Sequence, residues 1–171
     1  DLGLVHQVVK TLTESATKAG QKITNHVRST KRALAQMGAV LKSKSKDGKQ
    51  QIHKTLQRVS QLAKDTVEQF SAAVTKVRRG KNAPVARRLA EQRDLAKKVL
   101  DQIDQRLTGA TSIPERIVSM YDPEARPIRR GKLAKPNEFG RTMQLTQDQS
   151  GLMLDYEIQQ GNPSDKTKLI S

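Results

Sequence analysis

Six acidic residues near the C-terminal third of the chain are the first candidates for chemistry, because converging carboxylates hold the divalent ions of phosphoryl transfer. They are Asp122, Glu138, Asp148, Asp155, Glu157 and Asp165. Asp155 and Glu157 fall two residues apart in an alternating run, so they share one face of a predicted strand. Asp148 lies in a turn sequence and Asp165 at a predicted helix start, where aspartate usually has a structural role. We therefore assign no catalytic residue and no metal site, and Asp165 is the single candidate kept for catalysis.

Other catalytic and metal-binding arrangements are missing from the sequence. The histidines, His6, His26 and His53, lie on predicted helices, and no carboxylate spacing joins them into a metal motif. We interpret them as solvent-facing or core-edge residues. The chain has no Cys, which excludes disulfides and thiolate metal sites. It also has no Gly-rich phosphate loop after a strand and no GxSxG nucleophile elbow.

The tetrapeptide RRGK occurs twice, at 78–81 and 129–132. Two arginines and a lysine around a glycine can clamp a phosphate backbone, since glycine lets the main chain approach closely. The first copy is also an ordinary helix stop, and we interpret the repetition itself as a coincidence. The second copy lies in a predicted loop and is the better contact site. With the neighbouring cations, the predicted DNA-phosphate contacts are Arg78, Arg79, Lys81, Arg126, Arg129, Arg130, Lys132 and Lys135.

The distribution of charge favours a polyanionic partner. The chain carries 32 Lys and Arg against 17 Asp and Glu, a net charge of +15. Residues 1–110 hold +14 of this and residues 111–171 only +1. Such a basic stripe favours DNA through counterion release; a solvated Lys-rich surface and a membrane surface are the alternatives.

Location and further partners follow from what the sequence contains. No apolar run approaches the ~20 residues that span a bilayer, and no secretory signal opens the chain. We expect a cytoplasmic, nucleoid-associated protein with no membrane partner and no small-molecule substrate. Self-association is an additional expected interaction.

Helical periodicity dominates residues 1–110. Leu4, Val5, Val8, Val9 and Leu12 begin a pattern that predicts one helix over about 3–42, loosened near Gly20. After the polar break at 43–50, apolar residues from Ile52 to Val77 hold one face of a second helix. Gly80 and Pro84 suit its end and the start of a third helix, which closes at Gly109. Short connections predict an antiparallel hairpin or three-helix bundle. Because only 35% of residues are apolar and 2% aromatic, the core should be thin.

The pattern changes after residue 110. RIVSM (116–120) is a candidate short strand, and FGRTMQLTQ (139–147) and LMLDYEIQ (152–159) alternate with period two. The turn sequence DQSG (148–151) between them predicts a β-hairpin over about 139–159. GNPSD (161–165) leads to a helix start, with Ser164 or Asp165 as its cap. The predicted class is therefore α+β, mostly α, with a helical segment at 1–110 and a partial sheet at 111–171.

The stretch from 116 to 165 resembles the middle of bacterial insertion-sequence transposases of the DDE type. The residues that carry the resemblance form a strand-end motif (Ser119, Asp122, Pro123, Ala125, Arg126), then Gly131-Lys132, Glu138-Phe139-Gly140, a strand hairpin and Gly161-Asn162-Pro163-x-Asp165. The opening DLGLVHQVVKTL is similar to the helix after the first catalytic strand in a subgroup with a helical insert. The resemblance implies an RNase H-like sheet that the basic helices interrupt, with residue 117 where the chain re-enters that sheet.

The resemblance also implies what this segment lacks. The family uses three carboxylates to bind two Mg²⁺ ions for cutting and joining DNA strands. None of the three maps onto a residue here, and Asp165 matches a helix start rather than a catalytic strand. The chain begins at Asp1 rather than Met and ends just after a helix start, so we expect an internal fragment, or one chain of a broken transposase gene, that is inactive alone. We expect it to bind DNA, to hold no Mg²⁺ tightly, and to have a full-length transposase as a further partner. The alternative is a non-enzymatic basic helical protein that binds DNA or a protein partner.

Overall fold

The computed structural model describes residues 1–43, 47–77, 83–129 and 137–159. Four α-helices come first in these ranges: α1 (Leu2–Lys18), α2 (Val27–Ser43), α3 (Gly48–Val77) and α4 (Ala83–Leu107). Four short strands follow: β1 (Arg126–Arg129), β2 (Asn137–Gly140), β3 (Met143–Gln147) and β4 (Met153–Ile158). The predicted α+β class with mostly helical content is confirmed. The chain divides into two units, Asp1–Glu115 and Arg116–Ser171.

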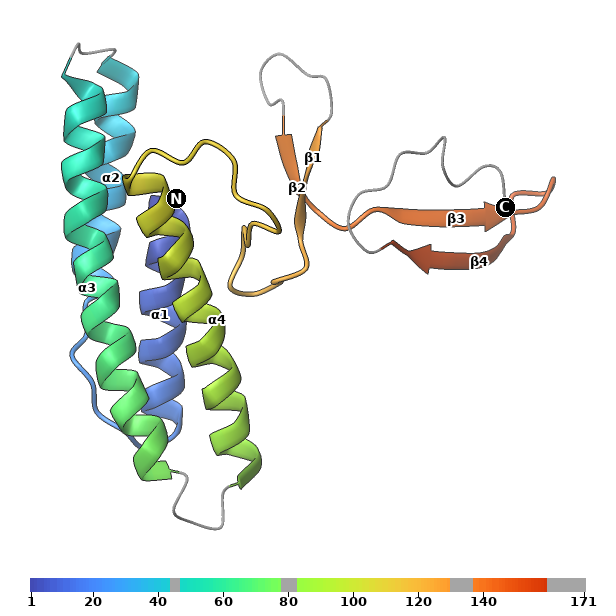
Figure 1. Ribbon diagram of the computed structural model, residues 1–171. Helices are drawn as coiled ribbons and strands as arrows, with labels where there is room; N and C mark the ends of the chain where they lie inside the picture. Colours follow the sequence, from blue (N-terminus) through green and yellow to red (C-terminus); the bar gives the residue numbers. More distant parts are fainter. Residues whose placement is uncertain (44–46, 78–82, 130–136, 160–171) are drawn as a thin grey trace. The chain divides into compact units, whose positions relative to one another are not determined.

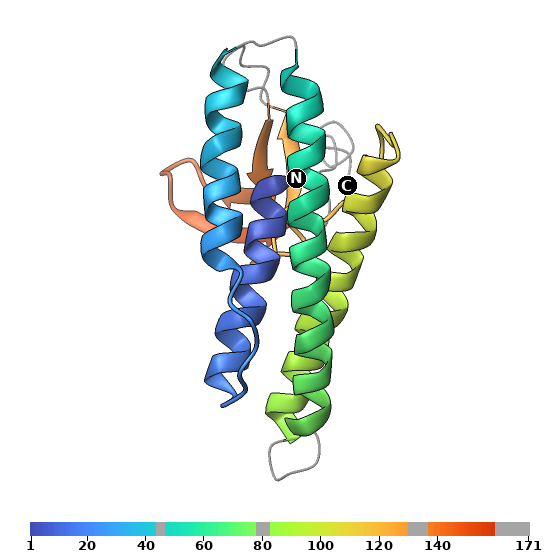
Figure 2. The same ribbon diagram turned by 90° about the vertical axis from the view of Figure 1, so that its left-hand side faces the viewer.

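The first unit is an antiparallel four-helix bundle (Figures 1 and 2). Helices α1 and α3 contact each other and form its middle. Helices α2 and α4 each pack against both of them but do not contact each other through described residues. The two outer helices therefore lie on opposite sides of the α1–α3 pair.

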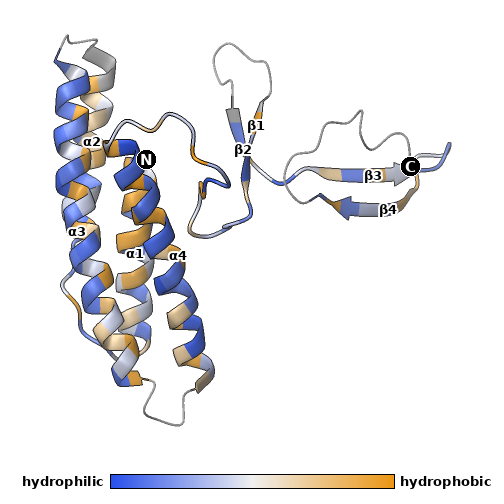
Figure 3. Cartoon of the chain, viewed as in Figure 1, coloured by the Kyte–Doolittle hydropathy of each residue, from blue (hydrophilic) through white to orange (hydrophobic). Residues whose placement is uncertain are grey.

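The core of the bundle is built largely from valine, leucine and alanine on the facing stripes of the helices (Figure 3). Val5, Val8, Val9 and Leu12 of α1 are fully buried, as the apolar periodicity predicted. Phe70 of α3 is the largest side chain with no exposed surface. Small buried residues fill the other contacts and let helices pack closely; they include Ala16, Ala33, Ala63, Thr66, Ala73 and Ala96.

The single helix predicted over 3–42 is wrong, because the chain breaks between α1 and α2. Gly20 has φ +70, a left-handed conformation that favours glycine. The amides of Gly20 and Gln21 donate to the carbonyls of Thr17 and Ala16, which closes α1 in a Schellman motif. The Asn25 side chain then accepts a hydrogen bond from the Val27 amide at 3.0 Å and caps the start of α2. The bundle accordingly has four helices instead of the predicted two or three.

The predicted limits of the last helix are close to those observed. Pro84 lies in the first turn of α4, where its missing N–H costs nothing. At the other end Gly109 has φ +101, and the amides of Gly109 and Ala110 donate to the carbonyls of Arg106 and Gln105. This is a second Schellman motif. Arg106 also reaches the Ala110 carbonyl at 2.7 Å and the Asp1 carboxylate at 3.4 Å, and so joins the end of α4 to the start of α1.

In the second unit the strands form two separate antiparallel hairpins, β1–β2 and β3–β4. Two predictions were wrong here. RIVSM (116–120) is not a strand, although Ile117 and Met120 are buried. The run FGRTMQLTQ is two strands, because its first residues, Phe139 and Gly140, belong to β2 and pair with β1 rather than β4.

The β3–β4 hairpin has one apolar and one polar face. Cross-strand partners lie on the same face of an antiparallel pair, and Met143 faces Ile158 while Leu145 faces Tyr156. The pairs Gln144–Glu157 and Thr146–Asp155 lie on the other face. The apolar side chains are about half exposed or more, with Tyr156 at 63%. In the turn, the Asp148 carboxylate accepts hydrogen bonds from the amides of Ser150 and Leu152, so the predicted turn is confirmed.

Candidate nucleic-acid interface

Most of the cations predicted to contact phosphates lie outside the described residues. These are Arg78, Arg79, Lys81, Arg130, Lys132 and Lys135, and the candidate Asp165 lies outside as well. Arg126 and Arg129 are the first and last residues of β1. The structure therefore places Arg126 in a described environment and brings no described pair of the predicted contacts together.

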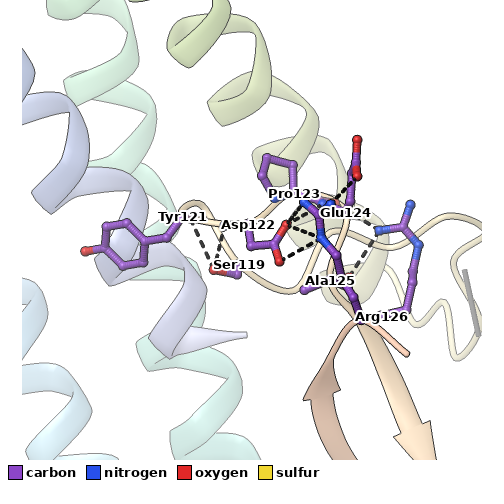
Figure 4. Close-up of polar contacts among 8 residues, drawn as sticks. Ser119, Tyr121, Asp122, Pro123, Glu124, Ala125 and Arg126 are labelled. Atoms are coloured by element: carbon purple, nitrogen blue, oxygen red, sulfur yellow. Dashed lines mark hydrogen bonds and ion pairs between the residues drawn. The ribbon is translucent and has the colours of Figure 1, made fainter. Parts of the chain in front are cut away.

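The strand-end motif around Arg126 forms a hydrogen-bonded loop (Figure 4). The Ser119 hydroxyl accepts from the amides of Tyr121 and Asp122, and Asp122 Oδ1 accepts from the Glu124 amide. The Arg126 guanidinium donates through Nη1 to the carbonyls of Pro123 (2.9 Å) and Ala125 (3.1 Å). The other guanidinium nitrogens of Arg126 form no hydrogen bond to a described residue. Arg126 therefore contributes to the hydrogen bonding of its own loop.

Arg141 is a residue of this loop that the sequence did not indicate. Its Nη2 lies 2.6 Å from Asp122 Oδ1, and its Nη1 lies 2.8 Å from Glu124 Oε2. The hydrogen bond from Arg141 holds the pKa of the Asp122 carboxyl below its ordinary value, and the same contact raises the pKa of Arg141. Arg141 is 19 positions after Asp122 in the sequence, and no local sequence pattern predicts an ion pair at this separation. Both acids are committed to Arg141 and are poorly suited as metal ligands.

Three further described acids of this unit, Asp148, Asp155 and Glu157, also serve local structure. The Ser150 hydroxyl and the Leu152 amide lower the pKa of the Asp148 carboxyl by hydrogen bonding to it. Asp155 accepts a hydrogen bond from the Tyr156 amide, and Glu157 accepts one from the Gln159 side chain. Within the described ranges, no group of three or more acidic or histidine side chains could hold a metal ion. The donors present do not fit a Mg²⁺ site.

The helical bundle presents many cations that form no ion pair with a described acid. Some of its lysines and arginines pair with acids, as in Lys64–Asp104 at 2.8 Å and Arg87–Glu91 at 3.1 Å. A larger group is exposed and forms no ion pair with a described residue. Its members are Lys18, Lys22, Arg28, Lys31, Arg32, Lys49, Lys54, Arg58, Lys76, Arg88, Lys97 and Lys98. The bundle is therefore a surface of available positive charge, and these residues extend the predicted contacts far beyond the RRGK copies.

His6 links α1 to α2 beneath part of this surface. Its Nδ1 lies 2.7 Å from the hydroxyl oxygen of Thr30, and Thr30 is fully buried. The same hydroxyl lies 3.0 Å from the Val27 carbonyl, so it can donate to that carbonyl while it accepts from a proton on His6 Nδ1. Burial lowers the pKa of His6, and the nearby charges of Lys10 and Lys31 lower it further. His6 is therefore a neutral structural residue at the core edge.

Comparison of the chain with protein-family models, with curated proteins and with solved structures finds no match. Among the described residues, no helix combines the length and the apolar character that crossing a bilayer requires.

Proposed function

We propose that this chain is a piece of a DDE transposase and that its helices bind DNA through the phosphate backbone. The observation that carries the DNA-binding part is the group of exposed, unpaired cations on the bundle, which belongs to a segment with a net charge of +14. Positive charge at this density binds DNA by releasing condensed counterions. No element of the described chain presents a recognisable base-reading motif, so the contacts are independent of sequence.

The resemblance of residues 116–165 to DDE transposases carries the family assignment. The exposed apolar face of the β3–β4 hairpin supports it, because a two-stranded sheet is marginal alone and such a face is usually covered in a larger sheet. In this proposal the hairpins are part of an RNase H-like sheet whose other strands carry the catalytic carboxylates. The described acids serve turns and ion pairs, so catalysis and Mg²⁺ binding belong to other parts of the parent enzyme.

Salt titration of DNA binding tests the proposed binding. A labelled duplex of arbitrary sequence is titrated with the full 171-residue chain at several salt concentrations, and anisotropy reports binding. We expect the logarithm of the affinity to fall linearly with the logarithm of salt, by about 0.9 for each phosphate neutralised. A second duplex of unrelated sequence should bind equally well. A binding curve that is flat between low and moderate salt would contradict the proposal.

The DNA that flanks this coding segment tests the family assignment. A transposase origin requires an upstream strand that ends in an Asp and a downstream strand that carries another. Intact reading frames on both sides indicate an active parent enzyme, and stop codons or frameshifts indicate a decayed gene. A start codon directly before Asp1 and a stop directly after Ser171 would rule out the transposase reading.

A second candidate is a non-enzymatic basic helical module. The division of the chain at Glu115 favours it, because the bundle buries a hydrophobic core within a unit of its own. Such a module would bind DNA or a protein partner without the strands. Both candidates can bind DNA through the bundle. They differ in the second unit, which is part of a larger enzyme in the first candidate and is not needed for binding in the second.

A further inference from the structure

Positive charge is concentrated in one stretch of the helical segment. Residues 15–64 contain 12 Lys and Arg and a single acid, Asp47, which gives a net charge of +11. The remaining 121 residues carry only +4. The concentrated stretch covers the end of α1, all of α2 and the first half of α3. Among the described residues, this stretch places exposed cations on α2 and on the first half of α3.

The packing of α2 and α3 turns these cations outward. The inner stripe of α2 is Thr30, Ala33 and Met37, and that of the first half of α3 includes Leu56 and Val59; all five are buried. Six cations on these two segments are exposed and form no ion pair with a described residue. We call them the α2–α3 basic face, which consists of Arg28, Lys31, Arg32, Lys49, Lys54 and Arg58.

The spacing of the basic face suits a double-helical backbone. Arg28 and Arg32 are one turn apart, about 6 Å along α2. Helices α2 and α3 are antiparallel neighbours (Figure 2). Arg32 is 11 residues before the end of α2 and Arg58 is 10 residues after the start of α3, so the two residues lie at similar heights along the pair. Duplex DNA carries about one phosphate per 1.7 Å of its axis, so several phosphates lie within reach of this face.

Helix α4, on the opposite side of the α1–α3 pair, is different. Its arginines Arg87 and Arg93 pair with Glu91 and Asp94 of the same helix. Asp104 of α4 also pairs with Lys64 of α3. Intramolecular acids therefore neutralise much of the positive charge on this side. Three of its cations, Arg88, Lys97 and Lys98, are exposed without an ion pair to a described residue.

We propose that the backbone of duplex DNA binds to the α2–α3 basic face. This proposal rests on the DNA binding proposed above and adds which surface binds and that the DNA is double-stranded. Single strands are bound largely by stacking on exposed aromatic side chains. The bundle has only Phe70, which is fully buried. Membrane surfaces are bound by helices that insert apolar side chains. Val85 of α4 is the only large apolar side chain exposed on the described part of the bundle. The basic face thus offers charge without stacking or insertion.

Two triple variants of the full chain test the proposal. R28Q/K31Q/R32Q removes three charges from the α2–α3 basic face, and R88Q/K97Q/K98Q removes three from α4. Glutamine has a helix propensity close to that of lysine and arginine, so both variants should keep the wild-type circular dichroism spectrum. We expect the α2 variant to bind duplex at least ~10-fold more weakly at low salt and to lower the salt slope by about 2 to 3. The α4 variant should change the slope by less than about 1.

The outcomes separate this proposal from the proposed function. If the wild-type chain shows no salt-dependent duplex binding, the proposed function fails and this inference fails with it. If wild type binds but the two triple variants weaken binding equally, DNA binding stands and the assignment to the basic face is overturned. Stronger binding to single strands of equal length than to duplex overturns the duplex assignment. Binding to vesicles of phosphatidylserine that duplex does not displace overturns it as well.

Discussion

Single residues in this chain mostly fix backbone rather than perform chemistry. The strand-end motif shows this clearly: Ser119 and Asp122 accept backbone amides, and Arg126 donates to two carbonyls of its own loop. Arg141 then holds Asp122 and Glu124. This motif is therefore distinctive because the structure of its loop requires these residues. A resemblance to another protein at these positions indicates a shared loop and does not by itself indicate catalysis.

His6 gives a prediction at the residue scale. Its pKa is lowered in the folded state from an ordinary 6.5, so the unfolded chain binds a proton more readily. The stabilisation from neutral His6 is therefore complete above about pH 6.5 and is lost as the pH falls below that value. His6→Asn cannot titrate and keeps an amide donor near the position of Nδ1 for Thr30. We expect the free energy of unfolding, measured with urea, to fall by less between pH 7.5 and pH 5 in this variant than in wild type.

The control for this prediction is His53→Asn. His53 is exposed on α3, so its replacement removes an imidazole at the surface rather than one that contacts a buried hydroxyl. The pH dependence of unfolding of this variant should match that of wild type. Equal pH dependence in wild type and His6→Asn would show that protonation of His6 is not coupled to folding.

At the scale of helices and strands, the sequence predicted those elements whose signals are local. The apolar stripe of α3, the first-turn proline of α4, the glycine that ends it and the Asp148 turn were all correct. The break between α1 and α2 was underestimated. Gly20 suggested loosening, but the cap at Asn25 lies in a stretch where Ile23 and Val27 continue the apolar period. Helical periodicity can persist across a break because it records burial rather than hydrogen bonding.

Strand pairing was harder to predict than strand content. β1 contains Pro127 and two arginines, and proline disfavours a strand because it lacks the N–H that would donate to the neighbouring strand. It pairs with β2 at positions that only the folded loop brings together. RIVSM has better composition, but it follows a positive φ at Glu115 and contains the Ser119 turn, and it finds no strand partner in the described chain. For the proposed interface, the exposure of the α2 cations and the Lys64–Asp104 pair between α3 and α4 depend on helix packing, so the sequence showed the charge but not its face.

The central helix supports a prediction at this scale. Phe70 of α3 has no exposed surface, and α3 contacts each of the other three helices. Phe70→Ala should lower the free energy of unfolding by about 3–5 kcal/mol through lost burial and a residual cavity. Val85→Ala on α4 is the control, since Val85 is 43% exposed and should change stability by less than about 0.5 kcal/mol. Chemical denaturation followed at 222 nm measures both. Similar losses in the two variants would mean that Phe70 is not part of a tightly packed core.

For the whole molecule, the division into two units coincides with a division of properties. The bundle holds a buried apolar core and most of the positive charge. The second unit consists of two-stranded hairpins with little net charge, and its β3–β4 face leaves apolar side chains exposed. A unit with its own core can fold alone, whereas two-stranded sheets need a covering layer. The two parts should therefore behave differently when they are separated.

Separation of the chain after Glu115 tests this expectation. Residues 1–115 alone should keep the helical circular dichroism spectrum, unfold cooperatively, and bind duplex DNA with the salt slope of the full chain, because the bundle holds both the core and the α2–α3 basic face. Residues 116–171 alone should show no cooperative transition. Loss of helicity in the first fragment would show that the bundle depends on the second unit and would count against a stand-alone helical module. Retained helicity with a reduced salt slope would instead place part of the DNA contact on the second unit, where Arg126 lies.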